Sequence, residues 1–76
     1  MKKDLNKALG KVLKELREKK GMSQQELGDY SDVDRSFISR IERGIGTPSV
    51  SIVFKICTLL EIKPSEFFQR IENLLK

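Results

Sequence analysis

The sequence has no histidine, no tryptophan and a single cysteine, Cys57. One cysteine cannot form an internal disulfide, and without histidine the usual nitrogen and sulfur ligands of a metal site cannot be assembled within one chain. Cys57 lies among apolar residues, so we interpret it as a small buried side chain. We therefore expect no metal and no cofactor. The lack of a convergent base, nucleophile or metal set also argues against an enzyme.

Long apolar runs are absent as well. None approaches the roughly 20 residues that a bilayer-spanning helix needs, and residues 1–4 are followed by charges rather than by the apolar region of a signal peptide. We expect a cytoplasmic protein without membrane contact. With 76 residues, 38% hydrophobic and 34% charged, the sequence predicts one globular domain, residues 1–76, and no separate ligand-sensing domain.

Positive charge is distributed unevenly along the chain. The net charge is +4, with +5 in residues 1–20, −2 in residues 21–46 and +1 in residues 47–76. A surplus of this size favours a polyanionic partner but does not prove one.

Apolar residues recur at helical spacing in five segments, which turn-forming residues separate. Ser23 and Glu26 have the spacing of a capping box, so a short second helix is expected to begin there. Asp34 is the expected cap of the third. Five short helices joined by tight turns predict a compact all-α fold. The apolar residues assigned to them are Leu5, Leu9, Val12, Leu13 and Leu16; Leu27 and Tyr30; Phe37, Ile38 and Ile41; Val50, Val53, Ile56, Leu59 and Leu60; and Phe67, Phe68, Ile71, Leu74 and Leu75.

The second and third helices, residues 23–30 and 34–43, have the lengths and the short connection of a helix-turn-helix. In that motif the second helix enters the major groove of DNA while the first lies across the backbone. A third helix that starts at Asp34 turns Arg35, Ser36, Ser39 and Arg40 towards the groove, and turns Ile38 and Ile41 towards the core.

These residues resemble the helix-turn-helix of the Xre/Cro family. The likeness runs through Ser-Gln-Gln-Glu-Leu at 23–27, Val-Asp-Arg-Ser-Phe-Ile-Ser-Arg-Ile-Glu-Arg-Gly at 33–44 and Thr-Pro-Ser at 47–49, and it covers roughly residues 9–68. It implies a five-helix, lambda-repressor-like domain. Within the family the chain most resembles the controller proteins of restriction-modification systems, which are short and dimeric.

Two positions depart from the family pattern. Gly28 stands where alanine is usual, and Asp32 where glycine is usual. Gly28 keeps a small residue at the contact between the two helices. Asp32 would have to adopt a left-handed backbone conformation, which aspartate tolerates better than most residues.

The third helix supplies the candidate base contacts. Arginine matches the O6 and N7 acceptors of guanine, although an arginine there could instead be solvated or bound to a phosphate. The resemblance maps the family's base-reading positions onto Arg35, Ser36 and Arg40. Phe37 either packs inward or contacts a thymine methyl group. The full set is Arg35, Ser36, Phe37, Ser39 and Arg40.

Backbone contacts are expected on both sides of that helix. The amino end of the second helix offers free amides, with Ser23 and Gln24 as side-chain donors, and Gln24 matches a family phosphate position. Arg43, Thr47 and Ser49 follow the third helix and could hold further phosphates.

Three acidic residues need separate interpretations. The resemblance implies that Glu42 forms a structural ion pair with Arg17, joining the first helix to the third. Asp29 and Asp32 form an acidic spot. Family members use similar positions to touch RNA polymerase, and the alternative is a solvated edge.

One recognition helix reads too few base pairs to find one operator, so we expect a homodimer. The candidate interface lies at the end of the fourth helix and on the fifth; the alternative is that this face covers the chain's own core. Its residues are Leu60, Ile62, Phe67, Phe68, Ile71 and Leu74. The predicted function is an autoregulating transcription regulator that binds operator DNA. An antitoxin-like or adaptor module with the same fold is the alternative.

Overall fold

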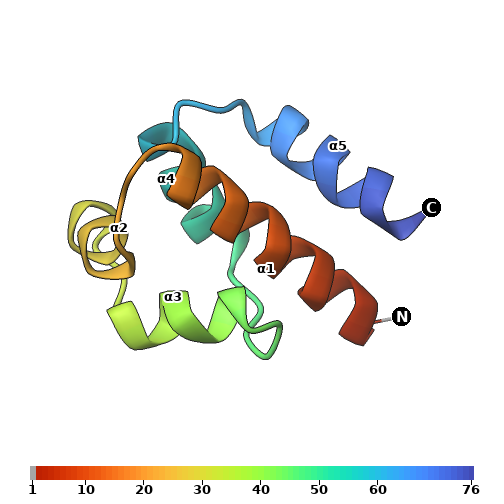
Figure 1. Ribbon diagram of the computed structural model, residues 1–76, viewed down its shortest axis with the longest axis horizontal. Coiled ribbons are helices and arrows are strands. Elements are labelled where there is room, and N and C mark those ends of the chain that lie inside the picture. The colour runs from red at the N-terminus through yellow and green to blue at the C-terminus, as the bar shows by residue number, and fades with distance from the viewer. Residues whose placement is uncertain (1) are drawn as a thin grey trace.

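The computed structural model describes residues 2–76, with side chains from Lys3 onward; Met1, the first residue of the predicted domain, lies outside them. These residues form five helices, which confirms the predicted all-α class. Figure 1 shows α1 crossing the molecule, with α3 below it and α5 above it. No helix of residues 2–76 is long and apolar enough to cross a membrane. The helices are α1 (Lys2–Lys19), α2 (Gln24–Ser31), α3 (Arg35–Glu42), α4 (Val50–Leu59) and α5 (Pro64–Leu75).

Side chains cap two of the helices. At α2 the predicted capping box is present: Glu26 N donates to Ser23 Oγ at 3.0 Å, and Ser23 N donates to Glu26 Oε1 at 2.9 Å. Ser49 Oγ accepts from Ile52 N at the start of α4. Asp34 is the N-cap of α3, but its side chain makes no capping hydrogen bond; its backbone carbonyl begins the helix instead.

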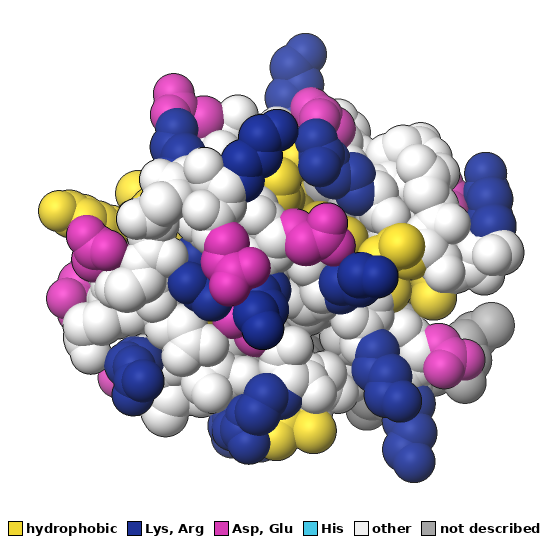
Figure 2. All heavy atoms as spheres, in the orientation of Figure 1, with side chains coloured by type: hydrophobic (Ala, Val, Ile, Leu, Met, Phe, Trp, Pro, Cys, Tyr) yellow, Lys and Arg dark blue, Asp and Glu magenta, His cyan; other side chains and the backbone are white. Residues whose placement is uncertain are grey.

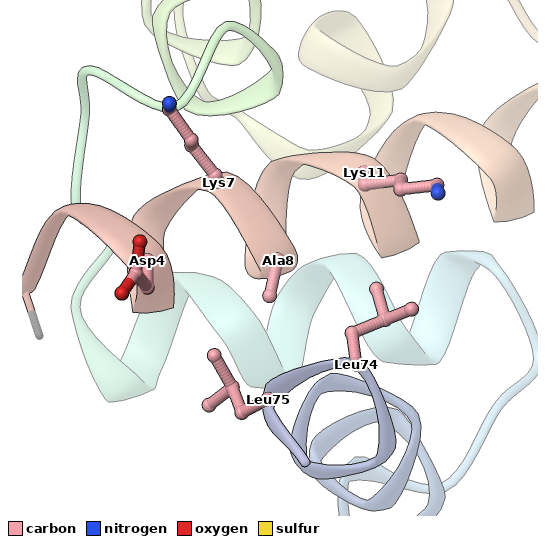
Figure 3. Close-up of a pocket in the computed structure, with 6 residues that line it drawn as sticks. All are labelled: Asp4, Lys7, Ala8, Lys11, Leu74 and Leu75. Carbon is pink, nitrogen blue, oxygen red and sulfur yellow. The ribbon is translucent and has the colours of Figure 1, made fainter.

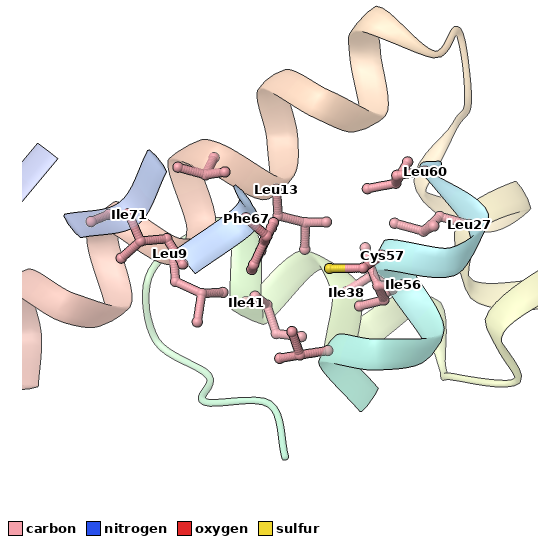
Figure 4. Close-up of a cluster of buried hydrophobic side chains, with 13 residues drawn as sticks. Leu9, Leu13, Leu27, Ile38, Ile41, Ile56, Cys57, Leu60, Phe67 and Ile71 are labelled. Carbon is pink, nitrogen blue, oxygen red and sulfur yellow. The ribbon is translucent and has the colours of Figure 1, made fainter. Parts of the chain in front are cut away.

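The core lies between α1 and the other four helices. α1 packs on α3 and α5, α2 packs on α3 and α4, and α4 packs on α5. Figure 4 shows these helices contributing side chains to one cluster. Cys57 lies within it, as predicted, and burial raises the pKa of its thiol to about 11. The buried apolar residues are Ala8, Leu9, Val12, Leu13, Leu27, Ile38, Ile41, Val53, Ile56, Cys57, Leu60, Phe67 and Ile71.

The exposed position of Tyr30 contradicts its predicted role as a core contact. Tyr30 is 70% exposed, because the next residue, Ser31, is the one that α2 turns inward one helical turn after Leu27. The buried Ser31 hydroxyl donates to Leu27 O at 2.6 Å, which satisfies it inside the core. Two more residues assigned to the apolar faces are exposed, because helix ends extend past the core: Val50, at the first position of α4, and Leu5, near the start of α1.

Half of the predicted dimer interface is inside the monomer. Leu60, Phe67 and Ile71 are buried, because α5 folds against α1 and α4, so the expectation that these side chains face a partner is wrong. Phe68 and Leu74 are exposed, and Ile62 is half-buried. The alternative, that the apolar face of α5 covers the chain's own core, therefore holds for these three buried residues.

Candidate nucleic-acid interface

A close approach between α2 and α3 sets the angle of the candidate recognition helix. A Cβ atom on Gly28 would lie 2.6 Å from the backbone oxygen of Val33, so only glycine fits this geometry without a shift. Asp32 ends α2 with φ 59° and ψ 42°, which confirms the predicted left-handed conformation. The backbone N–H groups of Asp32 and Val33 both donate to Gly28 O, closing the turn before α3.

The side chains of α3 divide into two faces. Ile38 and Ile41 are fully buried and hold the helix against the core, as predicted. On the other side Arg35, Ser36 and Arg40 are exposed, and Ser39 is half-buried. The buried isoleucines thus fix the helix while its polar side chains face outward.

Phe37 lies between these two faces. Its side chain is half-buried and packs against the core cluster, which is the inward-packing alternative named above. Its uncovered part borders the exposed face of α3.

The predicted ion pair between Arg17 and Glu42 is present. Arg17 Nε donates to Glu42 Oε2 at 2.6 Å and Arg17 Nη2 donates to Glu42 Oε1 at 2.9 Å, a bidentate arrangement. Arg17 Nη1 also donates to the Met22 carbonyl oxygen at 2.8 Å. The side chains of Arg17 and Glu42 are only 10% and 4% exposed. The hydrogen bond to Glu42 raises the pKa of Arg17 above its ordinary value, so the guanidinium stays charged.

Gln24 joins this pair, a contact that sequence reasoning missed. Gln24 Nε2 donates to Glu42 Oε1 at 3.0 Å, so α1, α2 and α3 all meet at one carboxylate. We call Arg17, Gln24 and Glu42 the Glu42 network. Gln24 was predicted to bind a phosphate; Glu42 accepts from one of its two amide protons, which leaves the other proton for a phosphate.

The other predicted phosphate ligands lie on the surface on both sides of α3. Ser23 and Ser49 accept capping hydrogen bonds, which leaves each hydroxyl proton available to an anion. Thr47 Oγ1 donates to Asn6 Oδ1 at 3.0 Å, which ties the loop after α3 to α1. Arg43 is exposed at the carboxyl end of α3. In Figure 2, Lys and Arg side chains project along the lower edge, from α3 to the amino end of α1.

Gly10 is a second residue that sequence reasoning missed. A Cβ atom there would lie 2.3 Å from Ile41 O and 2.8 Å from Glu42 O, so α1 can lie this close to the end of α3 only because residue 10 has no side chain. The available signal was a glycine inside a helix, which costs about 1 kcal/mol relative to alanine and often marks close packing.

The described residues offer no metal-binding cluster of His, Cys, Asp or Glu side chains. Asp29 and Asp32 are exposed near the turn between α2 and α3, and Asp29 accepts a hydrogen bond from Gln25 at 2.8 Å. The predicted acidic spot is therefore on the surface, beside α3.

Comparison with known proteins shows where this geometry recurs. A family model described as Helix-turn-helix matches residues 13–67. The transcriptional regulator SlrR of Bacillus subtilis is 38% identical over 61 residues, which are 79% of this chain and 40% of SlrR. The chain thus spans less than half of that relative.

Solved structures of other proteins share the fold. The restriction-modification controller protein C.AhdI from Aeromonas hydrophila has 40% identity and a TM-score of 0.80, over 83% of this chain and 96% of that one. The clp gene regulator ClgR from Corynebacterium glutamicum has 28% identity and a TM-score of 0.87, over 91% and 73%. The five-helix arrangement is the lambda-repressor-like fold that the sequence predicted. The chain belongs to the helix-turn-helix family of Xre/Cro-type DNA-binding transcription regulators, a family that is not enzymatic.

Proposed function

We propose that this protein regulates transcription as a homodimer that binds operator DNA, with α3 of each copy in the major groove. The two-sided structure of α3 is the observation that carries the proposal. Ile38 and Ile41 hold the helix to the core, and the exposed Arg35 and Arg40 extend away from it, where they can reach guanine O6 and N7. Ser36, Ser39 and the uncovered part of Phe37 complete the base-reading surface.

Backbone contacts would fix the position of α3 in the groove. The amino end of α2, with Ser23 and Gln24, would hold phosphates on one side of α3, and Arg43 and Ser49 would hold them on the other. Thr47 would join them by turning its hydroxyl proton from Asn6 to a phosphate. Such contacts carry no sequence information, but they set the register in which Arg35 and Arg40 meet the bases.

The likeness to C.AhdI along 83% of this chain supports a role as controller of a restriction-modification system. We propose control through concentration: the dimer forms and occupies its own operator as the protein accumulates. The protein would act on DNA in the bacterial cytoplasm.

Asp29 and Asp32 supply a further proposed contact. Both carboxylates are exposed next to the DNA-reading helix, so a basic surface of RNA polymerase bound beside the operator could reach them.

The dimer contact must lie on apolar surface that the monomer leaves uncovered. Ile45, Val50 and Phe54 are 58%, 69% and 52% exposed, more than Phe68 and Leu74 on α5 at 43% and 45%. Val50 and Phe54 are four residues apart and share one face of α4. Ile45 lies three residues after the end of α3, so a two-fold axis here keeps both recognition helices near the interface. We therefore place the contact on Ile45, Val50 and Phe54.

Sedimentation equilibrium tests this placement with one variant on each face. Phe54→Ser is expected to weaken the dimer, because it removes an exposed aromatic from a self-complementary contact, while Phe68→Ser leaves the dimer intact. The opposite result would move the interface to α5, where the sequence had placed it.

DNA binding itself is tested with duplexes selected from random sequence and with the DNA upstream of the protein's own coding region. Arg35→Ala with Arg40→Ala is expected to lower the preference for the selected site over mixed-sequence DNA by at least about 30-fold, since each bidentate arginine–guanine contact discriminates by about 1–3 kcal/mol. The matched control, Lys55→Ala with Lys63→Ala, removes the same charge from α4 and from the residue before α5, and keeps the preference. If the wild-type protein selects no site, the fold acts as a protein-binding module and the proposal fails.

A further inference from the structure

One face of α1 carries basic residues that the proposed DNA contacts do not use. Residues 3, 7, 10, 14 and 17 recur at spacings of four and three, so they form one stripe along the helix. Four of these residues are lysine or arginine, and the fifth is Gly10. The apolar stripe of the same helix, which includes Leu9 and Leu13, lies in the core instead.

Contacts at three levels show that this basic stripe lies against α3 and the loop that follows it. Arg17 is paired with Glu42, and Gly10 lies under the carbonyl oxygens of Ile41 and Glu42. Further towards the amino end, a Cβ atom on Gly44 would lie 3.1 Å from Lys7 Cγ and 3.2 Å from Lys7 Cα. α1 therefore runs antiparallel to the chain from residue 42 to residue 44 at close range.

The hydrogen bond from Thr47 to Asn6 extends this packing by one more step. Lys7 thus lies next to a loop whose Arg43 and Thr47 are proposed phosphate ligands. Figure 3 shows Lys7 extending towards that loop, away from Leu74 and Leu75. Lys3 precedes Lys7 by one helical turn, on the same stripe, and both lysines are exposed.

Asp4 is the only acidic residue among the first 14. It lines the groove of about 360 Å³ between α1 and α5, together with Lys7, Lys11 and Leu75. Lys3, Asp4 and Lys7 together still carry a net positive charge beside the loop that holds Arg43.

We propose that Lys3 and Lys7 form a phosphate-binding site with Arg43, so that α1 holds the DNA backbone at the carboxyl end of the recognition helix. The inference rests on the proposed function, because it needs α3 in the groove. It assigns to α1 a part in DNA binding beyond supporting α3. Since the ligand is the sugar-phosphate backbone, the site contributes equally on every sequence.

The experiment uses the full chain and a mixed-sequence duplex, so it does not depend on knowing the operator. Affinity is measured by fluorescence anisotropy at several salt concentrations between about 50 and 200 mM, for the wild type and for Lys3→Gln with Lys7→Gln. Glutamine keeps part of the aliphatic stem that packs against Gly44. Because each phosphate contact contributes about 0.9 to the slope of log K against log salt, the double variant is expected to flatten that slope by nearly 2 for each copy of the chain bound to the duplex.

The control is Lys55→Gln with Lys63→Gln, which removes the same charge elsewhere. An unchanged control slope together with a flattened slope in the α1 variant supports the site. The proposal is overturned if both variants flatten the slope of log K against log salt equally, or if neither flattens it. If urea unfolding shows that the α1 variant is destabilised, the single variant Lys3→Gln replaces it as the test, because Lys3 is exposed. Its slope is expected to flatten by about half as much as that of the double variant. A wild-type slope near zero would instead contradict the proposed DNA-binding function.

Discussion

Removing one partner of the Arg17–Glu42 pair should destabilise the fold far more than removing both. Glu42→Leu deletes the acceptor of three hydrogen bonds and leaves the Arg17 guanidinium, 10% exposed, with the Met22 carbonyl oxygen as its remaining hydrogen-bond acceptor. Breaking a buried pair in this way costs about 3–5 kcal/mol. A domain of 76 residues has a free energy of unfolding of about 4–11 kcal/mol, so the loss is a large fraction of it. The melting temperature should fall by at least about 12 °C.

Urea unfolding followed by far-ultraviolet circular dichroism measures the effect, since the chain has no tryptophan. Arg17→Met should cost about as much as Glu42→Leu, because it leaves a carboxylate buried with Gln24 as its partner. The double variant, with no buried charge, should be more stable than either single variant. The exposed pair of Arg70 and Glu66 is the control, and its removal should cost under about 0.5 kcal/mol. Single effects that are small and simply add in the double variant would refute the reasoning.

Two further predictions concern glycine packing and pH. Gly10→Ala should destabilise the domain by more than about 1 kcal/mol despite the better helix propensity of alanine, because the new Cβ meets the backbone oxygen of Ile41. Thermal unfolding measures this change. A stabilised variant would show that α1 and α3 can move apart without cost. Because the folded-state pKa of Cys57 is raised to about 11 from 9.0, the unfolded state loses its thiol proton first as the pH rises. Stability should therefore be unaffected by this group below pH 9 and should fall between pH 9 and about 11. Urea unfolding at pH 8 and 10.5 should show the wild type losing about 2 kcal/mol relative to Cys57→Ala, whereas equal losses would mean that the thiol is not buried.

The helices and the helix-turn-helix were predictable because their signals are local. Capping residues and apolar spacing act within one or two turns, so the capping box at Ser23 and the inward position of Ile38 and Ile41 could be read from the chain. The left-handed Asp32 and the Arg17–Glu42 pair followed from the likeness to a family rather than from spacing. Arg17 and Glu42 are 25 residues apart, and no local pattern connects them.

The features that sequence reasoning missed depend on packing between distant segments. Gly10 meets α3 about thirty residues later, and Thr47 meets Asn6 from 41 residues away. An apolar stripe also does not reveal what covers it, which is why α5 was taken as an outer face although Phe67 and Ile71 lie inside. The prediction for Tyr30 was wrong because spacings of three and four residues both fit a helix. Counted from Leu27, they point to Tyr30 and to Ser31, and α2 turns Ser31 inward.

The two faces of α3 have a consequence for how such a regulator can change during evolution. Ile38 and Ile41 maintain the fold, while Arg35, Ser36 and Arg40 lie on the exposed side of the same eight-residue helix. Substitutions at these exposed positions cost little stability, because exposed side chains away from caps and buried networks usually change it by less than about 0.5 kcal/mol. On the proposed mode of DNA binding, new operator preferences can therefore arise by single substitutions without compensating changes elsewhere. A duplicated gene could then acquire a separate set of targets while its product keeps the same scaffold.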